Sequence, residues 1–134
     1  MPGVPFSGPT VLLVEEVAPN FTSSPFELQQ VMLGSLVPVV SRALALALRQ
    51  NSAFFYQHLR DLTLIQRVVY YSRDATAGKH TDSGLFTPLF QDETEPGEQA
   101  SLKVYRGGTW IDVPGKKDEV VVNLGDTFQL WSNG

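Results

Sequence analysis

Several kinds of residue and segment are missing from this sequence, and each absence excludes a class of protein. There is no cysteine, so neither a disulfide framework nor a thiolate metal site can form. No apolar run approaches the roughly 18 residues that a membrane-spanning helix needs, and the N-terminus lacks the basic region of a signal peptide. Lysine and arginine are scattered and the formal net charge is −4, which gives no surface for nucleic acid or an anionic membrane. We therefore expect a cytoplasmic protein with no nucleic-acid or membrane partner.

The residues that are present have the proportions of an ordinary globular protein. The chain has 134 residues, of which 43% are hydrophobic and 18% charged, and this length corresponds to one domain. Its composition changes along the chain. We expect an irregular N-terminal segment over residues 1–23, which is rich in Pro and Gly, a helical region over residues 24–60 and a strand-rich domain over residues 61–134.

The helical region begins with a capping signal. Ser24 at the N-cap, Pro25 at the first helical position and Glu27 at the third form a capping box. Apolar residues then recur at three- and four-residue spacing up to residue 48, which predicts a long amphipathic helix. Pro38 removes one backbone hydrogen bond and should kink this helix. We expect the helix to back a sheet, in preference to serving as a membrane or partner helix.

A short second helix is predicted over residues 53–59, where Asn51-Ser52 supplies the cap. Its three consecutive aromatic residues, Phe54, Phe55 and Tyr56, are candidates for the core. His58 is interpreted as a partly exposed helical residue, and not as a metal ligand.

From residue 64 onward the apolar period is two, which predicts β-strands. Gly107-Gly108 indicates a hairpin, because both central positions of the tight turn require positive φ. Pro88 restricts its strand to an edge or a bulge. Helices followed by strands predict an α+β fold with an antiparallel sheet or an open barrel. The six expected strands cover residues 64–71, 86–90, 103–106, 109–113, 120–124 and 127–131.

The stretch with the most chemical content is His80-Thr81-Asp82. Residues two apart on an extended strand point to the same face, so an imidazole and a carboxylate should lie side by side. These are two of the three ligands of a facial 2-His-1-carboxylate site for Fe(II). A His-x-Asp arises by chance about once in ten chains of this composition, so the flanking residues must decide its meaning.

The flanking residues follow a recognisable order across residues 64–134. It consists of His80-Thr81-Asp82-x-Gly84-Leu85-x-Thr87, Gln91-Asp92, Leu102-x-Val104, Gly108-x-Trp110-Ile111-x-Val113-Pro114, Val121-Val122-Asn123-Leu124-Gly125-Asp126 and Leu130-Trp131-Ser132-Asn133-Gly134. This order of motifs resembles the iron(II)- and 2-oxoglutarate-dependent dioxygenase superfamily, and within it the isopenicillin N synthase-like subgroup.

The resemblance implies a fold and a set of site residues. The fold is that of N-terminal helices packed on an incomplete double-stranded β-helix, or jelly-roll, core. His80 and Asp82 match the first two iron ligands, and Tyr71 matches a tyrosine that hydrogen-bonds the 2-oxoglutarate co-substrate. The implied reaction uses dioxygen to hydroxylate or desaturate a small-molecule substrate. Asn123 and Asp126 are interpreted as turn residues whose side chains cap a tight bend.

The family also uses a second iron-binding His and an Arg for 2-oxoglutarate, both after the Trp-x-Asn-Gly segment. The sequence ends at Gly134, and His58 matches no family position. We therefore expect an oxygenase truncated before its site is complete, with weak or no activity as this chain stands. One alternative is a catalytically dead remnant that binds or dimerises through an exposed sheet edge. Another is a cupin-like metal protein that takes its further His from a partner chain.

Overall fold

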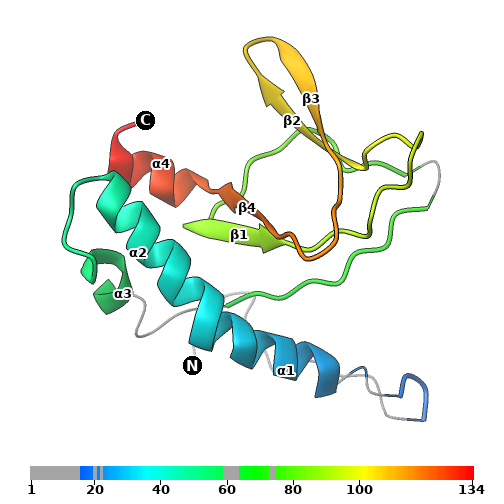
Figure 1. Ribbon diagram of the computed structural model, residues 1–134, viewed down its shortest axis with the longest axis horizontal. Helices are drawn as coiled ribbons and strands as arrows, with labels where there is room; N and C mark the ends of the chain where they lie inside the picture. The colour runs from blue at the N-terminus through cyan, green and yellow to red at the C-terminus, as the bar shows by residue number, and fades with distance from the viewer. Residues whose placement is uncertain (1–15, 20, 22, 59–63, 73–74) are drawn as a thin grey trace, which may run out of the picture. The chain divides into compact units, whose positions relative to one another are not determined.

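The computed structural model describes residues 16–19, 21, 23–58, 64–72 and 75–134. The chain divides into two compact units, Met1–Val69 and Tyr70–Gly134. Figure 1 labels the helices and strands of each. In their described parts the first unit is helical and the second contains strands and one helix. This agrees with the expected mixture of helices and strands.

The first unit contains one long helix with a wider turn in its middle. Helix α1 spans Ser23–Val31, a π-helical turn spans Met32–Leu36, and helix α2 spans Val37–Ala47. The π-helical turn ends two residues before Pro38, which has no N–H and whose ring would collide with a carbonyl one regular turn earlier. Where the sequence predicted a kink, the structure therefore has a π-helical turn.

Helix α3, Phe54–His58, packs against α2. The buried residues of the two helices form the core of this unit. The Asn51 side chain accepts a hydrogen bond from the backbone N–H of Ala53, as the sequence predicted for this cap. Phe55 is fully buried, whereas Tyr56 is largely exposed, so only part of the predicted aromatic core is confirmed. His58 is exposed and its ring meets that of Phe54 edge to face, which confirms its interpretation as a helical residue.

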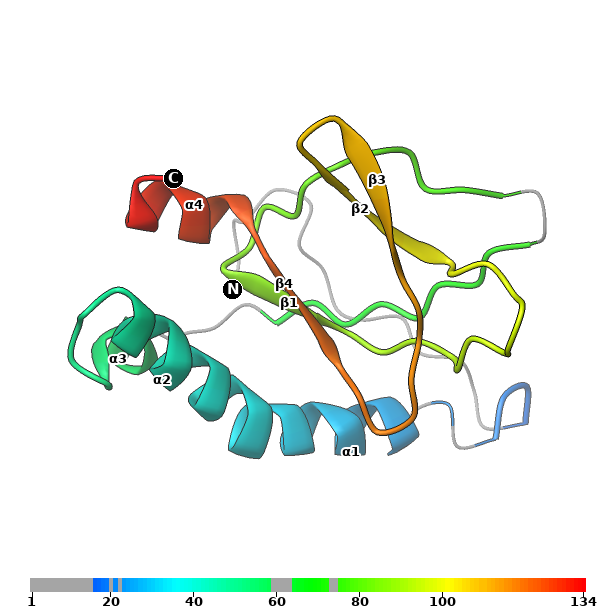
Figure 2. The ribbon, with the colours of Figure 1, turned by 45° about the horizontal axis from the view of Figure 1, so that its top comes forward.

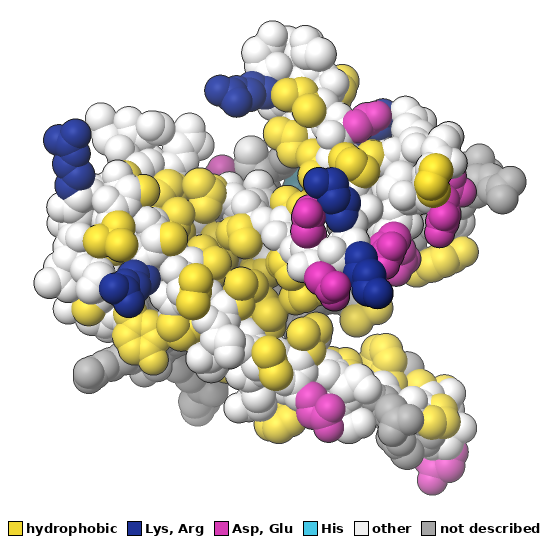
Figure 3. Space-filling model, viewed as in Figure 1, with side chains coloured by type: hydrophobic (Ala, Val, Ile, Leu, Met, Phe, Trp, Pro, Cys, Tyr) yellow, Lys and Arg dark blue, Asp and Glu magenta, His cyan; other side chains and the backbone are white. Residues whose placement is uncertain are grey.

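The continuous helix Ser23–Ala47 is long and apolar enough to cross a membrane, by length and composition. The expectation that no apolar segment approaches this length is therefore wrong, because polar residues such as Gln29 and Arg42 are few enough to leave the mean hydropathy of the helix high. Within α2 only Val37, Ser41 and Ala45 are buried, one helical turn apart. Several apolar side chains of the helix are exposed, and part of this surface is visible in Figure 3.

The second unit contains two antiparallel strand pairs and a short helix (Figure 2). Strand β1, Phe86–Leu89, pairs with β4, Val121–Leu124. Strand β2, Leu102–Arg106, pairs with β3, Thr109–Val113, as a hairpin. Gly107 and Gly108 both have positive φ at the hairpin turn, as predicted. Pro88 is tolerated in β1 because this strand has a single neighbour among the described strands.

Two predicted strands are wrong. Residues 64–71 belong to no helix or strand, and their apolar side chains are largely exposed. Period-two alternation therefore did not suffice there, because a strand also requires a hydrogen-bonding partner. Residues 127–131 lie inside helix α4, Asp126–Ser132. That helix is closed by Asn133 in the left-handed conformation, a C-terminal signal that the alternation of Phe128 and Leu130 concealed.

Candidate metal centre

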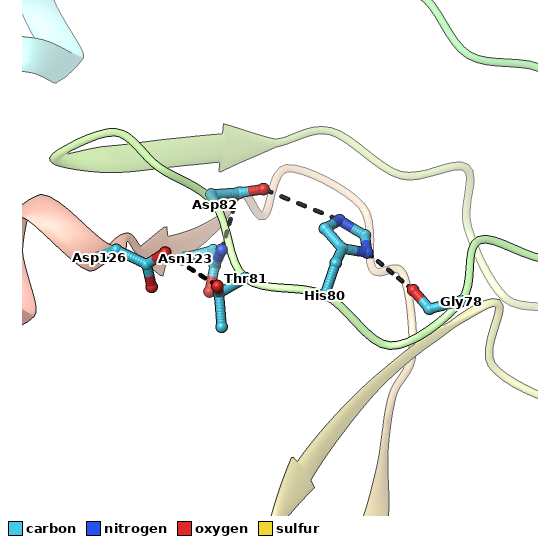
Figure 4. A network of polar contacts seen from close by, with 6 residues as sticks. All are labelled: Gly78, His80, Thr81, Asp82, Asn123 and Asp126. Atoms are coloured by element: carbon cyan, nitrogen blue, oxygen red, sulfur yellow. Dashed lines mark hydrogen bonds and ion pairs between the residues drawn. The ribbon is translucent and has the colours of Figure 1, made fainter.

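His80 and Asp82 lie in the loop that precedes β1, and not on a strand as predicted. Their side chains nevertheless face each other, with His80 Nε2 3.8 Å from Asp82 Oδ1 (Figure 4). This distance is too long for a hydrogen bond. The predicted juxtaposition of an imidazole and a carboxylate is therefore present, and the loop conformation provides it in place of a strand pleat.

The imidazole of His80 is oriented by the backbone two residues before it. Its Nδ1 lies 2.8 Å from the carbonyl oxygen of Gly78, and since a carbonyl can only accept, Nδ1 carries the hydrogen. In the neutral ring this leaves the lone pair on Nε2, the nitrogen that faces Asp82. Metal-binding histidines commonly donate their other N–H to a carbonyl or carboxylate, which fixes the tautomer in this way.

The carboxylate of Asp82 is held from the opposite side by β4. The side-chain amide of Asn123 donates a hydrogen bond of 2.8 Å to Asp82 Oδ2. Asp82 is partly buried, with 28% of its side chain exposed, whereas His80 is 66% exposed. The pair therefore presents one nitrogen and one oxygen donor that solvent and ions can reach.

The loop backbone is fixed by the turn between β4 and α4. The N–H of Asp126 donates to the carbonyl of Asp82, and the N–H of Gly125 donates to that of Leu85. The Thr81 hydroxyl donates to the Asp126 carboxylate at 2.9 Å. The interpretation of Asn123 and Asp126 as residues that cap their own turn is wrong. Their side chains instead reach a loop some 41 and 45 positions away, a pairing that no local sequence signal indicates.

A second set of contacts joins the same loop to the β2–β3 hairpin. The ammonium group of Lys79 lies 3.7 Å from the centre of the Tyr105 ring, a cation–π contact. Tyr105 in turn packs edge to face on Trp110, its cross-strand neighbour. Lys79, before His80, thus contacts β2, and Asp82, after it, is bonded by β4, so each strand pair contributes one contact.

The third predicted site residue is Tyr71, the candidate for binding the co-substrate. Tyr71 lies in an irregular segment with 55% of its surface exposed, and it is not part of the network in Figure 4. In the part of the chain that the structure describes, no group of three or more His, Cys, Asp or Glu side chains could hold a metal ion. His80 and Asp82 are the donor types that iron(II) accepts, but they form an incomplete set.

Comparison with known proteins places these residues in a family. Residues 62–134 match the 2OG-Fe(II) oxygenase superfamily. The 2-oxoglutarate-dependent dioxygenase caaD of Aspergillus niger is 47% identical over 88 residues, which cover 63% of this chain and 24% of the relative. The 2-oxoglutarate-dependent dioxygenase traH of Penicillium crustosum is 32% identical over 104 residues, which cover 71% of this chain and 31% of the relative.

A plant relative matches a shorter segment. The 1-aminocyclopropane-1-carboxylate oxidase 4 of Arabidopsis thaliana is 44% identical over 55 residues, covering 41% of this chain and 16% of the relative. The chain thus spans less than a third of the length of these three relatives. No solved structure matches it significantly. The family match covers more than half of the chain, which therefore belongs to the 2OG-Fe(II) oxygenase superfamily.

Proposed function

We propose that this chain is part of a non-haem oxygenase that uses iron(II), 2-oxoglutarate and dioxygen to hydroxylate or desaturate a small molecule. The observation that carries the proposal is the His80–Asp82 pair, in which an oriented imidazole nitrogen faces a carboxylate oxygen. We further propose that the two strand pairs of the second unit belong to the jelly-roll core of this family. The antiparallel pairing of β1 with β4, which are distant in the sequence, supports that assignment.

In this proposal each residue has one role. His80 Nε2 and Asp82 Oδ1 would hold the metal, the first as a neutral donor and the second as an anion that offsets its charge. The hydroxyl of Tyr71 would donate a hydrogen bond to the co-substrate. When bound, iron(II) and 2-oxoglutarate would activate dioxygen, the oxidant, for attack on an unactivated C–H bond, with 2-oxoglutarate giving up two electrons as it loses carbon dioxide and becomes succinate. The protein supplies binding, orientation and the exclusion of water.

The two donors by themselves should bind metal weakly. Structural sites with four ligands gain about 10–16 kcal/mol, or roughly 3–4 kcal/mol per ligand if the gain is shared evenly. Each missing ligand therefore lowers affinity by about two to three powers of ten. Iron(II) also lies low in the affinity order of divalent metals, so zinc or copper would compete with it. We expect the 134-residue chain to form little succinate from 2-oxoglutarate.

The test is to supply the donors that the described residues lack. A chain extended by a segment of the family type, with an Arg and a His, should convert 2-oxoglutarate to succinate when iron(II) and oxygen are present. The same extended chain carrying Asp82→Ala is the control and should be inactive. A folded extended chain that binds iron(II) but forms no succinate would remove the oxygenase proposal. Succinate formation that persists with Asp82→Ala would remove Asp82 from it.

A second candidate function, a module that self-associates, is favoured by the β2–β3 hairpin. Among the described strands, β2 and β3 pair only with each other, so each has one open edge. Val104 and Ile111, a cross-strand pair, are both nearly half exposed. Open edges with apolar side chains are surfaces on which a second copy can pair.

Sedimentation velocity over a range of concentrations tests this second candidate. A dimer should appear with rising concentration and should be lost when a charge is placed on the apolar face, by Val104→Lys. Val17→Lys is the matched control, since that residue is an exposed valine of the first unit. A chain that stays monomeric at all concentrations would rule the module out.

A further inference from the structure

Asn123 contacts a proposed metal ligand, Asp82, but is not itself a proposed ligand. It sits in β4, where the ladder places it opposite Thr87 of β1. Its amide is the donor of the 2.8 Å hydrogen bond to Asp82 Oδ2 (Figure 4). Because the strand pair fixes the position of the Asn123 backbone, the amide is presented to the carboxylate from a rigid element.

The contact of Asn123 differs in kind from the other contacts of this loop. The N–H groups of Gly125 and Asp126 hold the loop's main chain, and Thr81 holds its hydroxyl against Asp126. Only the Asn123 hydrogen bond among these four acts on the Asp82 carboxylate itself. Removing any of the others should loosen the loop, whereas removing the amide should change the orientation of the Asp82 carboxylate.

We propose that Asn123 is a positioning residue that holds Asp82 Oδ2 so that Oδ1 stays directed at His80 Nε2. The inference rests on the proposed function, because it assumes that these two atoms share a metal. An amide suits this role because it is a neutral donor, which orients the carboxylate without forming the ion pair that Lys or Arg would form in competition with a cation. Outer residues of this kind typically change metal affinity by about 10–100-fold when they are replaced.

The experiment measures the affinity of the full chain for Co²⁺, a probe for the divalent site, by calorimetry at fixed pH up to millimolar metal. Asn123→Leu keeps the approximate volume of the side chain and removes its donor. It should raise the dissociation constant by about 10–100-fold. Thr81→Val is the matched control, since it removes a hydrogen bond of the same loop that goes to Asp126 and not to the Asp82 carboxylate. It should change the constant by less than about threefold, although both variants lower the melting temperature by similar small amounts. Asn123→Ala replaces Asn123→Leu if the leucine variant does not fold.

The outcomes separate this inference from the function on which it rests. Equal affinities for wild type and Asn123→Leu would overturn the positioning role, as would equal losses for Asn123→Leu and Thr81→Val. If Asp82→Ala binds Co²⁺ as well as wild type, the metal site itself fails and the positioning role fails with it. If Asp82→Ala loses the metal while Asn123→Leu keeps it, only the positioning role is lost.

Discussion

Replacing Gly125 by alanine should destabilise the second unit by about 3 kcal/mol, an effect of the size expected for overpacking that also breaks hydrogen bonds. Gly125 is buried between β4 and α4. A Cβ there would lie 2.7 Å from the carbonyl oxygen of Asp82 and closer still to that of Gly84. Both neighbours are backbone atoms, so no side-chain rotation can relieve the collision. The backbone angles of Gly125, φ −97° and ψ 175°, suit any residue, so the cost comes from packing alone.

Chemical denaturation of the full chain measures this loss, and Gly84→Ala is the matched control. A Cβ on Gly84 meets nothing within 4 Å, although its carbonyl is the atom that the Gly125 variant would strike. We expect Gly84→Ala to stay within about 0.5 kcal/mol of wild type. If both variants unfold at the same denaturant concentration as wild type, the loop carrying His80 and Asp82 does not pack on this turn.

Removing either donor of the proposed metal site should lower Co²⁺ affinity by about 100–1,000-fold, which is the share of binding energy assigned to one ligand. His80→Ala removes the nitrogen, and Asp82→Ala removes the oxygen together with its negative charge. The chain contains its own control, because His58 is the only other histidine. It lies exposed on α3, in the first unit, so His58→Ala should leave the affinity unchanged.

Calorimetric titration of the three variants at one pH checks this prediction. If His58→Ala lowers the Co²⁺ affinity as much as His80→Ala does, the metal binds to any exposed imidazole and not to a specific site. Unchanged affinity in His80→Ala would contradict the role of the pair whose atoms lie 3.8 Å apart. Circular dichroism of each variant separates loss of a ligand from loss of fold.

Local signals in the sequence predicted the elements whose cause is local. The hairpin turn at Gly107 and Gly108 follows from the need for positive φ, and the cap of α3 follows from one Asn side chain. The effect of Pro38 on the long helix follows from its missing N–H. The sequence-based prediction failed where the same alternation of apolar and polar residues is compatible with a strand and with a helix. Residues 127–131 alternate in polarity, yet the left-handed Asn133 and the turn at Gly125 allow a helix instead.

The sequence by itself determined the family, the helical first part and the pair of side chains, since each depends on residues close together in the chain. Only the tertiary structure decided that β1 pairs with β4, and therefore that Asn123 reaches Asp82 and that Gly125 must have no side chain. The physical reason is that hydrogen bonds and close backbone approaches between residues some 40 positions apart are fixed by strand pairing. Neither the composition nor the periodicity of the β1 and β4 segments indicates that these two strands pair.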